Sequence, residues 1–150
     1  MRGEPSNPSV NRYLVDKSMD HIDHALGRPV DPMGATYRNR FVAGGADADE
    51  LSMSPHWEEG RRCGEMRYFG VTQAGRQALA NHLKAIGDKT RAFEVMFDGR
   101  TTRVPAITAA KARYALWLDI SDCFSDLTFA DFCRRTIVRA PHRERPEAPT

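Results

Sequence analysis

The spacing of apolar residues switches between helical and strand periods along the chain, which predicts an α+β fold. The first helix is expected over residues 15–27, where three apolar residues share one face: Ile22, Ala25 and Leu26. Asp16 or Ser18 can cap its N-terminus, and Gly27 can supply the left-handed residue that ends it. Residues 37–42, YRNRFV, alternate in a way that fits either a short strand or the edge of a helix.

The clearest junction is the stretch 66–87, MRYFGVTQAGRQALANHLKAIG. Its first six residues include two aromatics and predict a strand. Thr72 is placed to cap the following helix, whose apolar face comprises Ala78, Leu79, Leu83 and Ile86. Gly75 falls in the first turn of that helix, where a missing side chain lets another backbone segment pass close by. Upstream, Ser54 and Pro55 are expected to open one more turn of helix.

The last third of the chain predicts a β-hairpin packed with two helices, in the order ββαα. Apolar residues alternate on both sides of Asp98-Gly99, and both turn positions tolerate positive φ. Thr108 and Thr128 are expected to cap the two helices. Residues 137–138 can add a final edge strand to the hairpin.

These elements divide the chain into four segments. Residues 1–10 and 140–150 are polar and carry prolines, so we expect a disordered leader and a disordered tail. Between them, residues 11–87 and 91–139 form two modules. The tail includes Arg143 and Arg145.

Composition and charge narrow the class of protein. Of the 150 residues 41% are hydrophobic, which is enough for a core. Residues 1–65 carry 8 Lys/Arg against 11 Asp/Glu, a net −3, whereas residues 66–150 carry 14 against 9, a net +5. The three cysteines form no CxxC pair, and no apolar run approaches the ~20 residues of a membrane span. We therefore expect a cytoplasmic protein with reduced thiols.

Two resemblances accompany these patterns. YFGVTQAGRQAL (68–79) resembles the last wing strand and following helix of winged-helix regulators, with matches at Val71, Thr72, Gly75, Arg76 and Leu79. More broadly, the chain resembles small, largely uncharacterised accessory proteins of tailed phages and prophages. The features are HALGRP (24–29), YRNRFV, the Val-Thr-Gly-Arg junction and KARYALWLDISDCFSDLTFADFCRR (111–135). The first resemblance implies a degenerate winged-helix-like module over residues 11–87, and the second implies a mobile-element origin.

In winged-helix regulators the recognition helix precedes the two wing strands, which places it within residues 46–60 of this chain. That window contains no Lys or Arg, and its carboxylates would be repelled by the phosphates that line a major groove. We therefore expect these acids to contact a protein partner, and Trp57 either is exposed as an anchor for that partner or closes the core. This partner-binding set is Asp47, Asp49, Glu50, Trp57, Glu58 and Glu59.

Nucleic acid is the alternative partner. Basic residues lie at the expected wing tip and around the two C-terminal helices, where they could converge on one surface. This alternative set is Arg61, Arg62, Lys111, Arg113, Arg134, Arg135 and Arg139.

Candidate chemistry is sparse. DHIDH (20–24) spaces two histidines at i and i+3, which could bind a metal, but no third ligand is fixed, and we interpret the segment as an exposed polar helix face. Cys123 and Cys133 adjoin phenylalanines and resemble core thiols, whereas Cys63 falls in an expected loop. No phosphate-binding glycine loop, GxSxG or HExxH motif occurs. We expect no catalytic residue, metal or cofactor.

The resulting hypothesis is a non-enzymatic accessory protein of phage type that binds a macromolecular partner. The expected partner is a host protein, for example a component of a defence system that it inhibits. The alternative is a nucleic-acid-binding regulator that uses the wing and the C-terminal basic surface. A metal-dependent enzyme built on DHIDH is a third, weaker reading.

Overall fold

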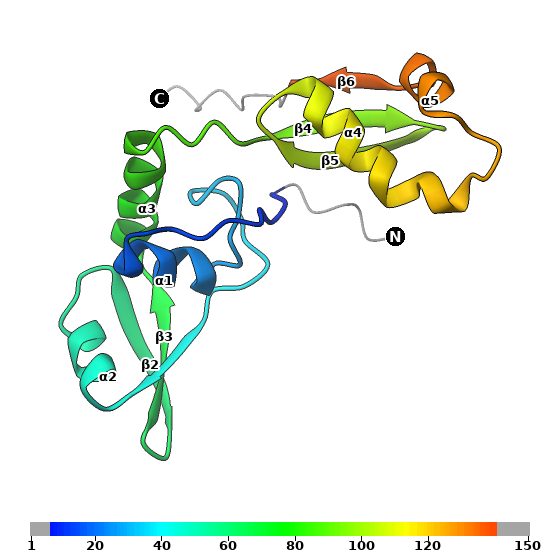
Figure 1. Cartoon of the computed structure of the whole chain (residues 1–150). Coiled ribbons are helices and arrows are strands. Elements are labelled where there is room, and N and C mark those ends of the chain that lie inside the picture. Colours follow the sequence, from blue (N-terminus) through cyan, green and yellow to red (C-terminus); the bar gives the residue numbers. More distant parts are fainter. Residues whose placement is uncertain (1–6, 141–150) are drawn as a thin grey trace, which may run out of the picture. The chain divides into compact units, whose positions relative to one another are not determined.

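The computed structural model describes residues 7–140 (Figure 1). The chain divides into two compact units, and their described parts are residues 7–89, here the N-terminal unit, and residues 90–140, the C-terminal unit. Each unit combines helices with a three-stranded antiparallel sheet, so the predicted α+β class is confirmed. The predicted disorder of residues 1–6 and 141–150 lies outside the described residues.

The N-terminal unit is built from six elements: α1 (Lys17–Ala25), β1 (Phe41–Gly44), α2 (Gly45–Ser52), β2 (Trp57–Cys63), β3 (Met66–Val71) and α3 (Gln73–Ala85). Its strands are ordered β1-β3-β2, and both pairs are antiparallel. Asp16 caps α1 and Gly27 has a φ of 84°, as predicted. The ambiguous stretch 37–42 becomes strand only in its last two residues.

The core of this unit lies between the sheet, α1 and α3. Phe69 of the central strand packs with Ile22 and Leu26 of α1 and with Leu79 of α3. Trp57 joins the same core and is only 7% exposed, so of the two alternatives for this residue the core position is confirmed and the exposed anchor is wrong. It pairs in register with Val71, and the alternation of the strands directs both side chains inward.

The junction between β3 and α3 follows the prediction closely. The Thr72 hydroxyl accepts a hydrogen bond from the Gly75 amide at 3.2 Å and caps α3. A Cβ at Gly75 would lie 2.5 Å from the carbonyl oxygen of His56, so glycine is required for this close approach. The expected helical turn at Ser54 and Pro55 is wrong. The chain there makes only a tight turn, in which the Ser54 hydroxyl accepts from the His56 amide.

Arg76, one of the residues that match the winged-helix pattern, donates hydrogen bonds to the loop between α1 and β1. Its guanidinium donates to the carbonyl oxygens of Pro32 and Gly34, each at 3.0 Å, and to the Thr36 hydroxyl at 3.2 Å. Five donors in a planar fork suit Arg for holding several oxygens of an irregular segment. This residue therefore fixes the loop that connects α1 to β1.

The N-terminal segment is ordered earlier than predicted. Residues 7–10 were expected to belong to the disordered leader, but Pro8 is buried and Ser9 forms a β-bridge with Pro29. The Asn7 side chain accepts from the Asp31 amide at 2.9 Å. A few residues further on, the Arg12 guanidinium binds the fully buried Asp23 carboxylate at 2.7 Å and Asp88 at 3.2 Å. These bonds hold the segment against α1, which the polar composition did not reveal.

The C-terminal unit contains β4 (Arg91–Phe97), β5 (Arg100–Ala106), α4 (Ala109–Ile120), the short 3₁₀ helix η1 (Ser121–Cys123), α5 (Phe129–Arg135) and β6 (Ile137–Arg139). Its strands are ordered β5-β4-β6. Asp98 and Gly99 have φ values of 52° and 76°, which confirms the predicted turn. Thr108 and Thr128 cap the two α-helices, and β6 is the predicted edge strand.

The core of the C-terminal unit lies between the sheet and the helices. Phe93, Val95 and Phe97 of β4 alternate toward Leu116 of α4 and Phe132 of α5. The opposite face of β4 carries Glu94 and Met96, which are partly exposed. The helices therefore cover one face of the sheet, as the predicted packing of helices on a hairpin requires.

Candidate partner-binding surfaces

Within the predicted acidic set, Trp57 is not available to a partner, and two of the carboxylates are paired with an arginine. Trp57 is in the core, and Arg67 of β3 forms ion pairs with both Asp49 of α2 and Glu59 of β2. These two bonds raise the pKa of the Arg67 guanidinium, most strongly through Asp49. Three exposed carboxylates form no ion pair within residues 7–140: Asp47, Glu50 and Glu58. Sequence spacing could not identify Arg67 as the counter-ion, because it comes from a different strand.

The predicted basic set does not form one surface within the C-terminal unit. Lys111 is exposed in the first turn of α4, but the Arg113 guanidinium donates to the buried Thr136 hydroxyl at 2.9 Å. Val138 packs against the core, so the neighbouring Arg139 points to the face of the sheet opposite the helices. The expected convergence of these residues is therefore wrong.

The remaining members of the basic set are exposed and partly paired. Arg134 forms an ion pair with Asp131 of the same helix, and Arg135 lies 3.8 Å from Asp98 with its guanidinium over the Phe97 ring. The Thr128 hydroxyl and then Arg134 lower the pKa of the Asp131 carboxyl. In the N-terminal unit, Arg62 pairs weakly with Glu59 at 3.4 Å. Arg61 forms no ion pair within the described part of the chain.

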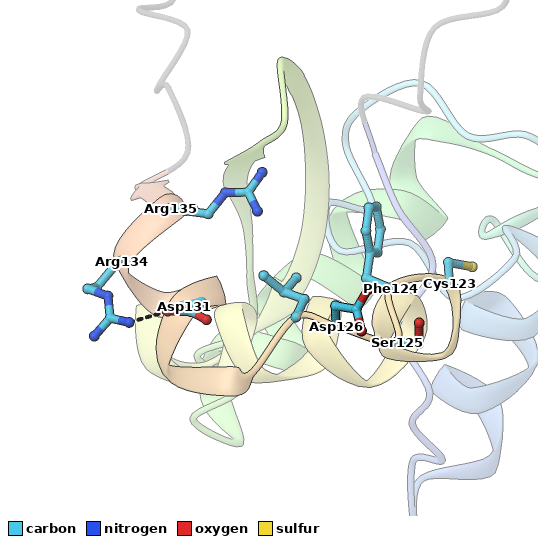
Figure 2. A pocket seen from close by; sticks show the side chains of 8 residues that line it. Cys123, Phe124, Ser125, Asp126, Asp131, Arg134 and Arg135 are labelled. Carbon is cyan, nitrogen blue, oxygen red and sulfur yellow. Dashed lines mark hydrogen bonds and ion pairs between the residues drawn. The ribbon is translucent and has the colours of Figure 1, made fainter.

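A cavity of about 500 Å³ lies beside α5 (Figure 2). It is lined by Cys123, Phe124, Ser125, Asp126, Leu127, Asp131, Arg134 and Arg135. The Arg134–Asp131 pair, dashed in Figure 2, neutralises two of its charged groups. No histidine lines this cavity, so the exposed Cys123 has no imidazole beside it there. The expectation that Cys123 is a core thiol is wrong.

The structure reveals an apolar surface that the sequence analysis missed, here named the aromatic patch: Tyr114, Trp117, Leu118 and Phe129. Tyr114 is 51% exposed, Leu118 57% and Phe129 42%. Tyr114 meets Phe129 edge-on at a centroid distance of 5.8 Å, and Trp117 lies 5.7 Å from the same ring. Trp117 also contacts the fully buried Phe132 at 5.3 Å. The exposed rings are thus held by a continuous series of ring contacts that begins in the core.

A sequence signal for this patch existed. The inward stripe of α4 is Ala112, Leu116 and their neighbours, yet Tyr114 and Leu118 are a second apolar pair at i and i+4 on the outer side. A helix that is apolar on both sides indicates either complete burial or a second contact. The inward stripe alone therefore does not account for the apolar residues of α4.

Acidic residues accompany the aromatic patch. Asp119 directly follows Leu118, and Asp122 lies four positions after Leu118. Asp126 lies three residues before the first residue of α5. All three are exposed, and none forms an ion pair within residues 7–140. Lys111 is the basic residue one turn before Tyr114 on the outer side of α4.

In the DHIDH segment, both aspartates and the first histidine contact other side chains of the N-terminal unit. Asp23 pairs with Arg12 and Arg28, and Asp20 pairs with Arg28 at 2.7 Å, which lowers the pKa of the Asp20 carboxyl. The His21 ring lies 5.0 Å from Phe41. Within residues 7–140, no group of three or more His, Cys, Asp or Glu side chains is placed to hold a metal ion.

None of the helices between residues 7 and 140 has both the length and the apolar character needed to cross a bilayer. Comparison with protein-family models, with curated proteins and with solved structures gives no match to this chain.

Proposed function

We propose that this chain is a non-enzymatic accessory protein of phage type that binds a host protein through the aromatic patch of its C-terminal unit. One observation carries the proposal: three neighbouring large apolar side chains, Tyr114 and Leu118 of α4 and Phe129 of α5, are about half exposed. Exposed apolar groups that cluster in this way mark interaction sites, whereas single exposed apolar residues are ordinary. This surface replaces Trp57 as the anchor.

The rigidity of the patch supports binding. Tyr and Trp are enriched among the residues that dominate interface energies. Here the ring contacts from Phe132 through Trp117 to Phe129 restrict these side chains before a partner arrives. Less side-chain entropy is then lost on association, and a larger share of the contact energy contributes to affinity.

The charges near the patch define the chemistry of the partner. Asp119, Asp122 and Asp126 outnumber Lys111, so this part of the unit is acidic. We propose that the partner presents apolar side chains flanked by Lys or Arg, since such a surface is complementary in charge and associates faster.

We also propose that the N-terminal unit is a degenerate winged helix. Supporting observations are the strand order β1-β3-β2, the placement of α2 before the two-stranded wing β2–β3, and the Thr72-capped α3 after it. The helix that precedes the wing carries Asp47, Asp49 and Glu50 and no basic residue. An acidic helix is unsuited to the major groove, which favours a protein partner over a duplex.

Site-specific photo-crosslinking tests the proposal. A photoreactive residue at Leu118 should capture a discrete host protein from lysate, and the same residue at Ile86 should not. Ile86 is a matched control because it is 55% exposed and lies in the N-terminal unit. The variant Tyr114→Ser/Phe129→Ser should lose the captured partner. Equal capture from both positions, or capture that survives this double substitution, would contradict the proposal.

A further inference from the structure

The sheet of the N-terminal unit has a second face that the core does not use. Phe69 and Val71 of β3 are buried, and alternation along the strand directs Tyr68 to the opposite side. Two guanidinium groups lie over the Tyr68 ring, those of Arg40 and Arg61, each 5.8 Å from the ring centroid. An aromatic ring on the central strand is thus flanked by two cations.

Local backbone structure places both arginines beside this ring. The pairing of β2 with β3 shifts register between Glu59 and Arg62, and Arg61 belongs to this irregularity. A β-bulge of this kind redirects a side chain. Arg40 precedes β1, and its amide donates to the Ala25 carbonyl at 3.0 Å, which fixes its backbone against α1.

Arg40 and Arg61 are free to bind a ligand anion. Both are exposed, and neither forms an ion pair within the described residues, whereas Arg67 on the other face is held by two carboxylates. Glu58 is a nearby acid, since it pairs in register with Gly70 and points to the same face as Tyr68. Asp49 of α2 lies on the other side, because it pairs with Arg67 there.

The surroundings of the ring are flat and partly apolar. Val42 pairs in register with Tyr68 and is 40% exposed, and Met66 is 44% exposed two residues before Tyr68. Gly70, two residues after it, contributes no side chain to this face. A planar group that displaces one of the two guanidinium groups could therefore lie against the ring without meeting a bulky neighbour on the central strand.

We propose that this face binds single-stranded nucleic acid. Proteins that bind single strands combine aromatic rings, on which bases stack, with cations that neutralise the phosphates. Tyr68 supplies the ring, and Arg40 and Arg61 supply the cations on either side. A duplex does not fit this arrangement, because its bases are already stacked on one another. The proposal is independent of the aromatic patch in the C-terminal unit.

The test is fluorescence anisotropy of the full chain with labelled ten-nucleotide oligo-dT and oligo-rU at low salt. Tyr68→Leu should lower affinity about tenfold, whereas Tyr68→Phe, which keeps the ring, should bind as the wild type does. Arg61→Gln should weaken binding and reduce the slope of log K against log salt by about 0.7. Glu58→Gln should strengthen binding, because it removes the opposing charge. Arg100→Gln, an exposed arginine of the C-terminal unit, should have no effect.

Several results would overturn the proposal. These are the absence of saturable binding by the wild type, equal affinity of the Tyr68→Leu and wild-type proteins, and equal competition by a duplex of the same length. Displacement of the oligonucleotide by poly-glutamate at equal charge would instead assign the face to an acidic protein. Far-UV circular dichroism of Tyr68→Leu and Arg61→Gln checks that the sheet is retained, and Glu58→Gln tests the charge argument without removing any contact to the ring.

Discussion

The buried ion-pair network of the N-terminal unit and the aromatic patch of the C-terminal unit differ in how their side chains are used. In the N-terminal unit, the large aromatic Trp57 is buried, and Arg12, Arg28 and Asp23 form an ion-pair network in which the carboxylate is fully buried. In the C-terminal unit, Tyr114, Leu118 and Phe129 remain exposed over a small core. Side chains that are committed to contacts within a unit report on its stability, and those that are left open are available for a partner.

The largest effect is expected at Asp23. Asp23→Ala removes the buried carboxylate that binds Arg12 and Arg28 and leaves their charges partly uncompensated. We expect the free energy of unfolding to fall by about 3 kcal/mol or more. Urea denaturation in a Trp117→Phe background, where Trp57 is the fluorescent probe of the N-terminal unit, measures this loss. Asp49→Ala, at an exposed ion pair, should leave the midpoint nearly unchanged, and equal losses in both variants would refute the distinction.

A smaller loss is expected at Gly75. Gly75→Ala would place a methyl group 2.5 Å from the His56 carbonyl oxygen and 2.7 Å from a Val71 methyl group. Relief of this overlap requires a backbone shift, and we expect a cost of about 1–3 kcal/mol. The same denaturation series measures it. Ala80→Gly in α3 is the control, and we expect it to lower the free energy of unfolding by about 1 kcal/mol. Gly64→Ala is unsuitable as a control because Gly64 has a φ of 61°, which strains any other residue.

The Asp20–Arg28 pair adds a dependence on pH. Arg28 holds the pKa of the Asp20 carboxyl below its ordinary value of 3.8 in the folded protein. The contribution of the ionised group is therefore complete above pH 4 and disappears as the pH falls through the lowered pKa. We expect Asp20→Asn to be less stable than wild type at pH 6, with the difference shrinking below pH 4. A difference that grows toward low pH would show that the pair does not act through ionised Asp20.

The smallest effect on stability is expected in the aromatic patch. Leu118→Ser changes an exposed side chain, and we expect the free energy of unfolding to change by no more than about 0.5 kcal/mol. Thermal unfolding of the two proteins provides the measurement. A loss of several kcal/mol would mean that Leu118 belongs to the core of the C-terminal unit, and the comparison between the units would fail.

Local signals predicted much of the fold. Asp16, Thr72, Thr108 and Thr128 cap helices as expected, because capping depends on a few consecutive residues. The turn at Asp98-Gly99 is equally local. The sequence spacing of these residues was therefore sufficient.

The candidate surfaces were harder to predict because they depend on contacts between distant segments. Whether Trp57 faced solvent depended on its pairing with Val71, and the charge of Asp49 depended on Arg67, eighteen positions away. Arg76 is a similar case, since its partners lie in the loop before β1. The alternation of apolar and polar residues predicts which face of a segment is buried. It does not identify the distant segment that packs against that face or pairs with its charges.

The bond from Arg12 to Asp88 has a practical consequence for dividing this protein into fragments. Arg12 lies near the start of the N-terminal unit and Asp88 near its end, so this bond connects the two ends of the unit. A shortened gene that starts after Arg12 or stops before Asp88 would encode a chain unable to make this bond. Expression trials of the isolated unit should therefore keep both ends.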